Sequence, residues 1–470
     1  MRSFIYFLRV TCCGLAFSCS VVSCRKLIAV APPQNQLTVS SVFSDDKDAE
    51  AAMLGVYISM MNNARSLLNG GMSIFGGLSA DELVRSFSNS NEDAFTLNAL
   101  SDQNPLCSNL YTAGYNWIYD CNNILEKMAV STGISDSVRR QLRGEASFSR
   151  ALVYFYLVNL FGDIPLVTTT DYSISSLLPR SPAEKVYRQI IADLETAQTD
   201  LKESYVTTAA FADDRTRPNK AAATALLARI YLYQGEWVLA AQAAGDLIGN
   251  DAYRLETDLD KVFLSGSKEA IWQLQPVRER ISTAEGNMFV PLATDARPVY
   301  ILTPTLLGSF ETGDQRLLHW VGGESGGNHY LYPFKYKLAT DVPFGMEYNT
   351  MLRLSEQYLI RAEARARQGK TDSAAADLNI IRRRAGLEGT PAPAPASASG
   401  SSDLIAAIMH ERQIEFFAEC GHRWLDLKRT GWADSVLGVE KPGWRAQAAL
   451  YPIPFVELRH NPYLVQNAGY

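Results

Sequence analysis

Apolar positions recur with helical spacing along most of this chain, in segments separated by polar and glycine-rich stretches. Between positions 219 and 248 they form two successive helix faces that meet at Gly235, which predicts a hairpin of two close-packed helices. A less regular copy of the pattern surrounds Gly369. Residues 136–161 are apolar on nearly every side and predict a central buried helix. The chain is therefore predicted to be mainly α-helical.

Helix pairs account for most of the length. One helix is expected from position 45, another over residues 113–128, and another from Met351. We predict one domain over residues 45–470, with a C-terminal segment at 403–470 and four helical hairpins at about 45–129, 136–203, 219–250 and 351–386. The order Tyr231, Gly235, Trp237, Ala240 in the third hairpin is similar to the middle of a tetratricopeptide repeat (TPR).

Two long stretches lack the helical period. Residues of about 62–110 are rich in Gly, Ser and Asn, and residues of about 253–350 mix loops with short strands, including a predicted strand over 271–277. Irregular regions of this length in a helical protein more often form functional surfaces than simple connections. The segment GTPAPAPASASGSS at 389–402 is of low complexity and is expected to be a solvated loop.

The first residues have the pattern of an export signal. An apolar core spans residues 10–22. The tetrapeptide Val21-Val22-Ser23-Cys24 at its end is similar to the bacterial lipoprotein box. We predict a signal peptide at 1–23, acylation of Cys24 and an extended tether at 24–44. A plain signal peptide with a chance cysteine is the alternative. No later apolar run is long enough to span a bilayer.

Charge and cysteine content narrow the classes of function. With 470 residues, 47% of them hydrophobic, the chain can bury a large core, and its net charge of −6 makes nucleic acid and anionic lipid unattractive partners. Cys107 and Cys121 could pair in an oxidising compartment, but the spacing does not decide it. No cysteine or histidine pair has the spacing of zinc ligands, so no metal and no cofactor is predicted.

Catalytic patterns are weak. Residues 323–327 (GESGG) match the serine-hydrolase pattern around Ser325, but the following residues alternate like a strand and do not begin a helix. His410-Glu411 begins like a metalloprotease helix, yet Ile414 stands where the second zinc ligand belongs. Glu411 and Glu415, one turn apart near Arg412 and Arg423, suggest structural ion pairs. We therefore predict a protein that is not an enzyme.

Aromatic and amide residues gather in the two irregular stretches. Sugar rings stack their C–H faces on aromatic rings, and their hydroxyls pair with polar side chains. This composition nominates a set of ligand-binding residues: Asp81, Phe87, Asn89, Asn287, Phe289, Tyr300 and Trp320. The alternative is that these aromatic residues anchor their loops to the core.

Seven segments, in order, resemble the SusD/RagB family of nutrient-uptake lipoproteins. They are CRKLIAVAPPQNQLT from Cys24, LSADEL at 78–83, GEASFSRALVYFYLVNLFGDIPLVTTTDY at 144–172, RPNKAAATALLARIYLYQGEW, EYNTMLRLSEQYLIRAEARA, ERQIEFFAECGHRWLDLKRTG, and LYPIP…NPYLVQNAGY at the end. The resemblance implies a SusD-like fold of four TPR-like hairpins wrapped by an irregular region.

The same resemblance implies a function. The chain would be a lipid-anchored protein of the outer membrane, facing the exterior, that binds oligosaccharide and caps a SusC-like TonB-dependent transporter as a hinged lid. Peptide replaces oligosaccharide in the RagB branch, and a TPR-type scaffold remains a further alternative. Arg25 and Lys26 depart from the acidic residues that often follow the lipidated cysteine in surface-exported members.

Overall fold

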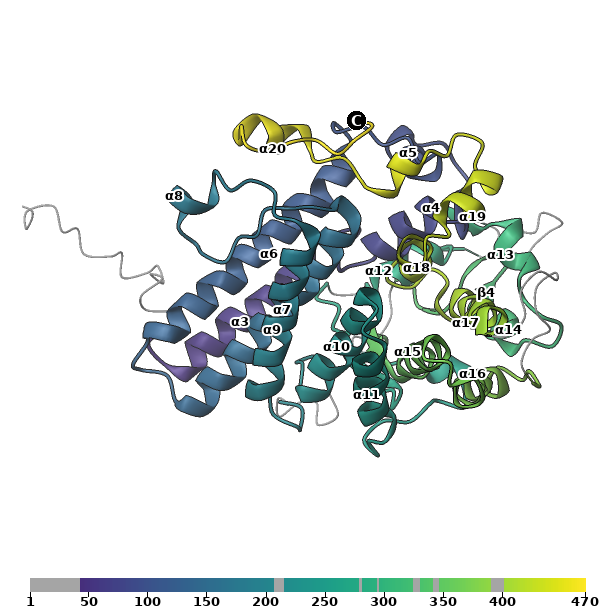
Figure 1. Cartoon of the computed structure of the whole chain (residues 1–470), viewed down its shortest axis with the longest axis horizontal. Coiled ribbons are helices and arrows are strands. Elements are labelled where there is room, and N and C mark those ends of the chain that lie inside the picture. Colours follow the sequence, from purple (N-terminus) through teal and green to yellow (C-terminus); the bar gives the residue numbers. More distant parts are fainter. Residues whose placement is uncertain are drawn as a thin grey trace, which may run out of the picture.

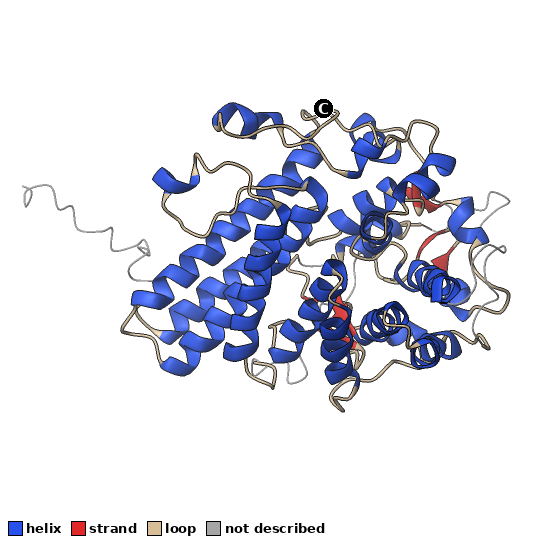
Figure 2. Ribbon diagram, viewed as in Figure 1, coloured by secondary structure: helices blue, strands red, loops and turns tan. Residues whose placement is uncertain are grey.

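The computed structural model describes residues 43–206, 215–278, 281–293, 296–323, 330–340, 346–389 and 401–470. Cys24, nearly all of the predicted tether, and Ser325 lie outside these ranges. Helices make up most of the described chain, and the strands are few and short (Figure 2). The predicted fold class, mainly α with a loop-rich region that contains short strands, is confirmed.

Four long helices form one side of the molecule (Figure 1). They are α3 (Asp46–Asn62), α6 (Pro105–Val130), α7 (Asp136–Phe161) and α9 (Ala183–Asp200). From Gln141 to Phe161 all of α7 except Arg143 and Asn159 is buried, as its apolar sequence predicts. Helix α6 begins before the predicted start because the Asn104 side chain accepts from the backbone N–H groups of Leu106 and Cys107.

Two helical hairpins pack against each other beside this bundle. They are α10 (Lys220–Gln234) with α11 (Trp237–Ile248), and α15 (Leu354–Arg367) with α16 (Thr371–Arg384). Gly235 and Gly369 end the first helix of each hairpin with φ of 74° and 75°, a conformation that favours glycine. Small side chains fill the seam between the hairpins, which allows the helices to approach closely: Ala228, Ala240, Ala244 and Ala364.

A buried pair of strands precedes the second hairpin. Strands β2 (Ala270–Leu274) and β6 (Asn349–Arg353) are antiparallel, and every residue in both is buried. The strand therefore ends before Pro276, earlier than predicted. The helix expected from Met351 begins only at Leu354, because residues 349–353 pair with β2, a partner more than seventy residues away in sequence.

Shorter elements complete the described chain. In the irregular stretches and the loop after α7 lie η1 (Met72–Gly76), α4 (Gly77–Ser79), β1 (Leu83–Arg85), α5 (Ser90–Thr96), α8 (Tyr172–Ser175), η2 (Leu259–Lys261), α12 (Ala284–Phe289), β3 (Tyr300–Leu302), α13 (Pro304–Gly308), α14 (Gln315–Trp320), β4 (Val321–Gly322) and β5 (Tyr332–Pro333). The C-terminal segment forms α17 (Ser401–Phe416), α18 (His422–Arg429), α19 (Ala433–Glu440), η3 (Ala446–Ala449) and α20 (Phe455–His460).

A buried network of ion pairs ties α17 to the second irregular stretch. Arg316 donates to Glu411 at 2.6 Å and to Glu415 at 2.9 Å, and all three side chains are fully buried. Arg353 also bonds Glu415, and it bonds Glu419 at 2.7 Å. The structural role predicted for Glu411 and Glu415 is confirmed, although their partners are these distant arginines. Arg412 bonds Asp426 instead, and Arg423 bonds Asp81.

The described helices and cysteines bear on the predictions about membrane spans and disulfides. Within the described ranges, no helix combines the length and hydropathy needed to cross a bilayer. Cys107 and Cys121 are buried free thiols. They lie fourteen residues apart on α6, or roughly 20 Å along a helix, so they do not form the disulfide that remained open on sequence grounds.

Candidate functional site

A two-stranded ladder joins the two irregular stretches. Strand β1 pairs antiparallel with β3, with Arg85 opposite Tyr300. Past the end of the ladder, the backbone N–H of Ser86 donates to the carbonyl of Val299 at 2.9 Å. The residues that follow β1 and those that precede β3 therefore emerge at the same place on the molecule.

An exposed aromatic cluster lies at this place. The Arg297 guanidinium carbon is 4.2 Å from the centroid of the Tyr330 ring and 5.3 Å from that of the Phe87 ring. Phe87 is 49% exposed and Arg297 is also exposed, so both present surface to solvent. We call Phe87, Arg297 and Tyr330 the aromatic platform. A cation held against two rings fixes their orientation, and the exposed part of the rings remains available for stacking.

A buried carboxylate holds the base of the platform. Glu92, on α5, is 1% exposed and accepts from Arg65 at 2.9 Å and from the Tyr300 hydroxyl at 2.6 Å. It also bonds Arg85, whose Nε donates to the carbonyl of Phe87 at 2.9 Å. Burial, together with the bond to Glu92, raises the pKa of Tyr300 and keeps its hydroxyl a donor. The backbone that presents Phe87 is thus fixed by charged groups beneath it.

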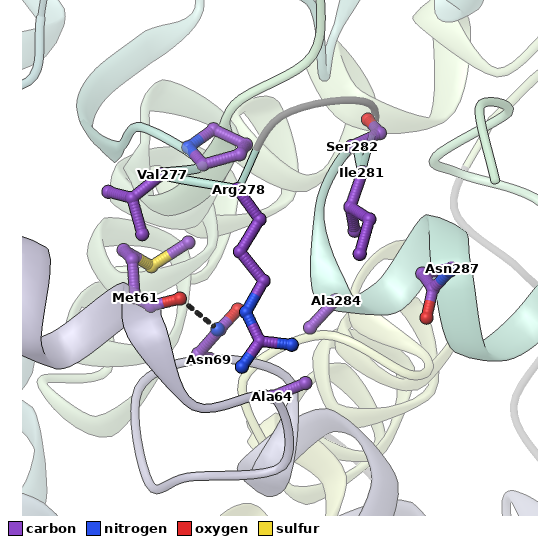
Figure 3. Close-up of a pocket in the computed structure, with 10 residues that line it drawn as sticks. Met61, Ala64, Asn69, Val277, Arg278, Ile281, Ser282, Ala284 and Asn287 are labelled. Atoms are coloured by element: carbon purple, nitrogen blue, oxygen red, sulfur yellow. Dashed lines mark hydrogen bonds between the residues drawn. The ribbon is translucent and has the colours of Figure 1, made fainter. Parts of the chain in front are cut away.

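A pocket lies next to this group (Figure 3). It encloses about 360 Å³, counting its open side, and its walls come from the end of α3 and the loop after it, the segment after β2, and the start of α12. Ten residues line it: Met61, Ala64, Asn69, Pro276, Val277, Arg278, Ile281, Ser282, Ala284 and Asn287. We call it the α12 pocket. Arg65 and Met288 follow two of these lining residues and contact each other at 3.9 Å, so the pocket adjoins the Glu92 group.

Four of the seven predicted ligand residues are buried, which argues against direct ligand contact. Asp81 forms a two-point ion pair with Arg423, at 2.7 and 2.8 Å. Phe289 is 3% exposed, and Tyr300 and Trp320 are not exposed. For these aromatic residues the alternative, that they anchor their loops to the core, agrees with the structure, because no free ring face remains for a sugar.

The other three predicted residues lie on the surface. Phe87 belongs to the aromatic platform, and Asn287 lines the α12 pocket. Asn89 is exposed next to the platform, where its side chain accepts from the backbone N–H groups of Asn91 and Glu92 and caps α5. The structure thus brings these three to one region around α5 and α12, and their contact with ligand stays a prediction.

Sequence reasoning missed four residues of this region: Asn69, Arg278, Arg297 and Tyr330. None of them lies in a motif, and each acquires its place through residues far away in the chain. The grouping of Arg297 with Phe87, for example, depends on the ladder between β1 and β3. Within the described part of the chain, no cluster of His, Cys, Asp and Glu has the arrangement of a metal site.

Comparisons with known proteins agree with this architecture. Residues 48–232 match a family model described as "Starch-binding associating with outer membrane", and residues 328–470 match one described as "SusD family". The chain is 28% identical to SusD-like protein P2 of Formosa agariphila, over 93% of this chain and 95% of that protein. It is 24% identical to the starch-binding protein SusD of Bacteroides thetaiotaomicron, over 72% of this chain and 74% of that protein.

Solved structures share the fold. A SusD superfamily protein from Bacteroides vulgatus superposes with a TM-score of 0.78 at 23% identity, over 91% of this chain and all of that one. A laminarin-binding SusD-like protein superposes with a TM-score of 0.74 at 24% identity, over 91% of this chain and 100% of the other. The matches extend from the helical bundle through both hairpins to the C-terminal segment, and the chain belongs to the SusD/RagB family.

Proposed function

We propose that this protein is a cell-surface lipoprotein that binds oligosaccharide and delivers it to a SusC-like TonB-dependent transporter of the outer membrane, without catalysing a reaction. The observation that carries the binding step is the aromatic platform, where Arg297 lies against Phe87 and Tyr330. The names of two similar proteins, one starch-binding and one laminarin-binding, support a carbohydrate ligand over a peptide.

The platform suits a sugar for a physical reason. The partly exposed Phe87 and Tyr330 rings offer apolar faces on which the C–H face of a sugar can stack. The Arg297 guanidinium has five N–H donors for ring and hydroxyl oxygens. Because Arg85 and Glu92 already hold the backbone at Phe87, little conformational entropy is lost when ligand binds.

The ion pairs of the buried carboxylates favour a protein that binds its ligand without catalysis. Glu411 and Glu415 are engaged by Arg316, and Asp81 is engaged by Arg423. A catalytic carboxylate needs an open side towards substrate, whereas these groups are buried and bonded to arginines. This favours a binding protein over a hydrolase.

A second surface suits the transporter. Exposed apolar side chains gather around α8 and the segment at α20, which lie along one edge of the molecule (Figure 1): Tyr172, Ile174, Leu177, Phe455, Val456, Tyr463 and Val465. Asn461 donates to the carbonyl of Leu178 at 2.8 Å and Arg180 donates to that of Val465 at 2.8 Å, which joins the two segments. Contiguous apolar surface of this kind marks sites of protein association.

Isothermal titration of the mature protein against a panel of neutral and acidic oligosaccharides and of peptides tests the binding step. We expect at least one oligosaccharide to bind, and Phe87→Ala to weaken its binding roughly tenfold, since one stacked ring contributes on the order of 1 kcal/mol. Tyr119→Ala is the matched control, because Tyr119 is 53% exposed on α6, away from the platform. Peptide binding with no oligosaccharide binding would overturn the glycan assignment.

The partner step has its own experiment. Tagged protein purified from native membranes in mild detergent is expected to retain a large β-barrel protein. Val465→Asp, which places a charge on the apolar edge, is expected to reduce that recovery while oligosaccharide binding stays unchanged. Recovery of the free lipoprotein alone from wild-type membranes would contradict the role as a transporter lid.

A further inference from the structure

The α12 pocket contains a hydrogen-bond acceptor without a partner. Asn69 is 4% exposed, and its Nδ2 donates to the carbonyl of Met61 at 2.8 Å. Its Oδ1, which is also buried, accepts no hydrogen bond. A buried amide oxygen without a donor costs free energy, on the order of 1–3 kcal/mol. A ligand that brings a hydroxyl group to this atom would remove that cost.

The same pocket contains a positive charge that no described carboxylate neutralises. The Arg278 side chain extends across the pocket towards the loop that carries Ala64 and Asn69 (Figure 3). No carboxylate of the described ranges forms an ion pair with it. The exposed Arg278 therefore directs five donors into a space where the described residues supply no anion.

Carboxylates near the pocket are already engaged. Glu92 bonds Arg65 and Arg85. Glu347 accepts from the backbone N–H of Lys337 at 2.7 Å and from the Ser282 hydroxyl at 3.2 Å. Glu285 accepts from Ser73 at 3.0 Å, and its burial raises the pKa of its carboxyl to about 7, which reduces its negative charge near neutral pH. Among the described residues that line or adjoin the pocket, the balance of charge is therefore positive.

The remaining wall is apolar. Met61, Val277, Ile281 and Ala284 line the pocket together with Asn287 and Ser282. The pocket is open on one side and its space of about 360 Å³ includes open solvent, so a ligand residue would lie across its mouth and would not be enclosed. The pocket thus offers a ligand three features: the Arg278 cation, the Asn69 acceptor that lacks a donor, and an apolar wall.

We propose that the α12 pocket binds a uronic acid residue, so that the protein selects an acidic oligosaccharide. The uronate carboxylate pairs with Arg278, one ring hydroxyl donates to Asn69 Oδ1, and the C–H face lies on Val277 and Ile281. A neutral sugar leaves Arg278 without an anion, and a simple carboxylate leaves Asn69 Oδ1 without a donor. The proposal rests on the proposed function, and the Arg65–Glu92–Arg85 group connects this pocket to the aromatic platform, where neighbouring sugars of the same chain would lie.

The test compares two forms of one ligand. Mature protein is titrated with trigalacturonate and with its carboxyl-reduced, neutral counterpart, at low and at physiological salt. We expect trigalacturonate to bind at least tenfold more tightly, because hydrogen bonds to charged groups contribute more than neutral ones. Arg278→Gln is expected to remove that preference and to leave the affinity for the neutral form within about twofold.

Arg140→Gln is the matched control, since Arg140 is exposed at the start of α7 and the substitution changes net charge equally. Thermal melting checks that both variants fold. Equal affinity for trigalacturonate and its neutral counterpart would overturn the uronate assignment, as would equal losses of trigalacturonate affinity in Arg278→Gln and Arg140→Gln. If the neutral form still binds in that case, the proposed function stands. Binding of neither form, with binding of a peptide carboxylate instead, would overturn both.

Discussion

Trp320 and Phe87 are both aromatic rings beside a cation, but one ring is buried and the other is exposed. Each ring lies close to a cation: Lys335 Nζ is 4.9 Å from the Trp320 centroid, and the Arg297 guanidinium carbon is 5.3 Å from the Phe87 centroid. Both residues come from loop-rich stretches, and the sequence nominates both for ligand binding. Yet Trp320 is fully buried, whereas Phe87 is half exposed.

The difference lies in what surrounds the cations. Near Trp320, Lys335 pairs with Glu419 at 3.0 Å, and Arg353 pairs with Glu419 and Glu415. Trp320 Nε1 donates to the carbonyl of Leu259 at 3.0 Å. Arg297, by contrast, has no ion pair with the carboxylates of the described chain. A buried charge must be paired because desolvation is costly, whereas an exposed one can remain free for a ligand. The first group therefore stabilises the fold and the second is available for binding.

Removing Arg353 is expected to have the largest effect. Arg353→Ala leaves the buried Glu415 and Glu419 with fewer cations, and loss of one partner from a buried ion pair costs about 3–5 kcal/mol. Arg297→Ala should change the free energy of unfolding by less than about 0.5 kcal/mol. Urea denaturation measures both values, and similar losses in the two variants would erase the contrast between the two groups.

Acid should weaken the same buried network. Burial alone would raise the pKa of Glu419, but Arg353 and Lys335 outweigh burial and leave that pKa below its ordinary value. Its contribution to stability is therefore present above pH of about 4.5 and is lost as pH falls through the lower folded-state pKa. Urea titrations between pH 6 and pH 3 should show a steep loss for wild type and a shallower loss for Arg353→Ala.

Glu285 tests the cost of a buried carboxylate that has no cation among the described residues. Burial raises its pKa from 4.5 to about 7, so the folded state binds more protons than the unfolded state between these values. Stability should therefore fall as pH rises from 4.5 to 7, by roughly 1–3 kcal/mol. Glu285→Gln should not show this fall and should be the more stable protein at pH 8. A parallel pH dependence in both proteins would contradict the assignment.

Trp320→Phe is expected to cost about 2 kcal/mol, because it removes the bond to Leu259 and leaves a small cavity. Oligosaccharide affinity per folded molecule should not change. Phe87→Leu is the counterpart: its effect on stability should be small, and its effect on affinity should be severalfold. A loss of affinity in Trp320→Phe, measured well below its melting temperature, would return Trp320 to the list of ligand residues.

Arg297→Gln is expected to weaken binding modestly. The substitution removes the cation from the Phe87 and Tyr330 rings, and we expect oligosaccharide affinity to fall about threefold to tenfold, on the order of 1 kcal/mol. Arg140→Gln again serves as the control for net charge. An unchanged affinity would show that the rings alone, and not their cation, form the binding surface.

Local pattern determined the long helices of this protein. The continuous apolar character of residues 136–161 and the small residues around Gly235 specify α7 and the α10–α11 hairpin without help from distant residues. Helical hydrogen bonds join residues four apart, so the relevant partners are always present in the local sequence. The mainly α fold class followed from these segments.

Tertiary structure decided the strands and the candidate site. Strands β1 and β6 each need a partner far away in the chain, and no local period revealed them. Whether an aromatic residue is buried like Trp320 or exposed like Phe87 depends on what folds over it. Arg278 and Arg353 also carry the same charge in the sequence. Only the positions of the carboxylates in space pair Arg353 with Glu269, Glu415 and Glu419 and leave Arg278 without an ion pair among the described residues.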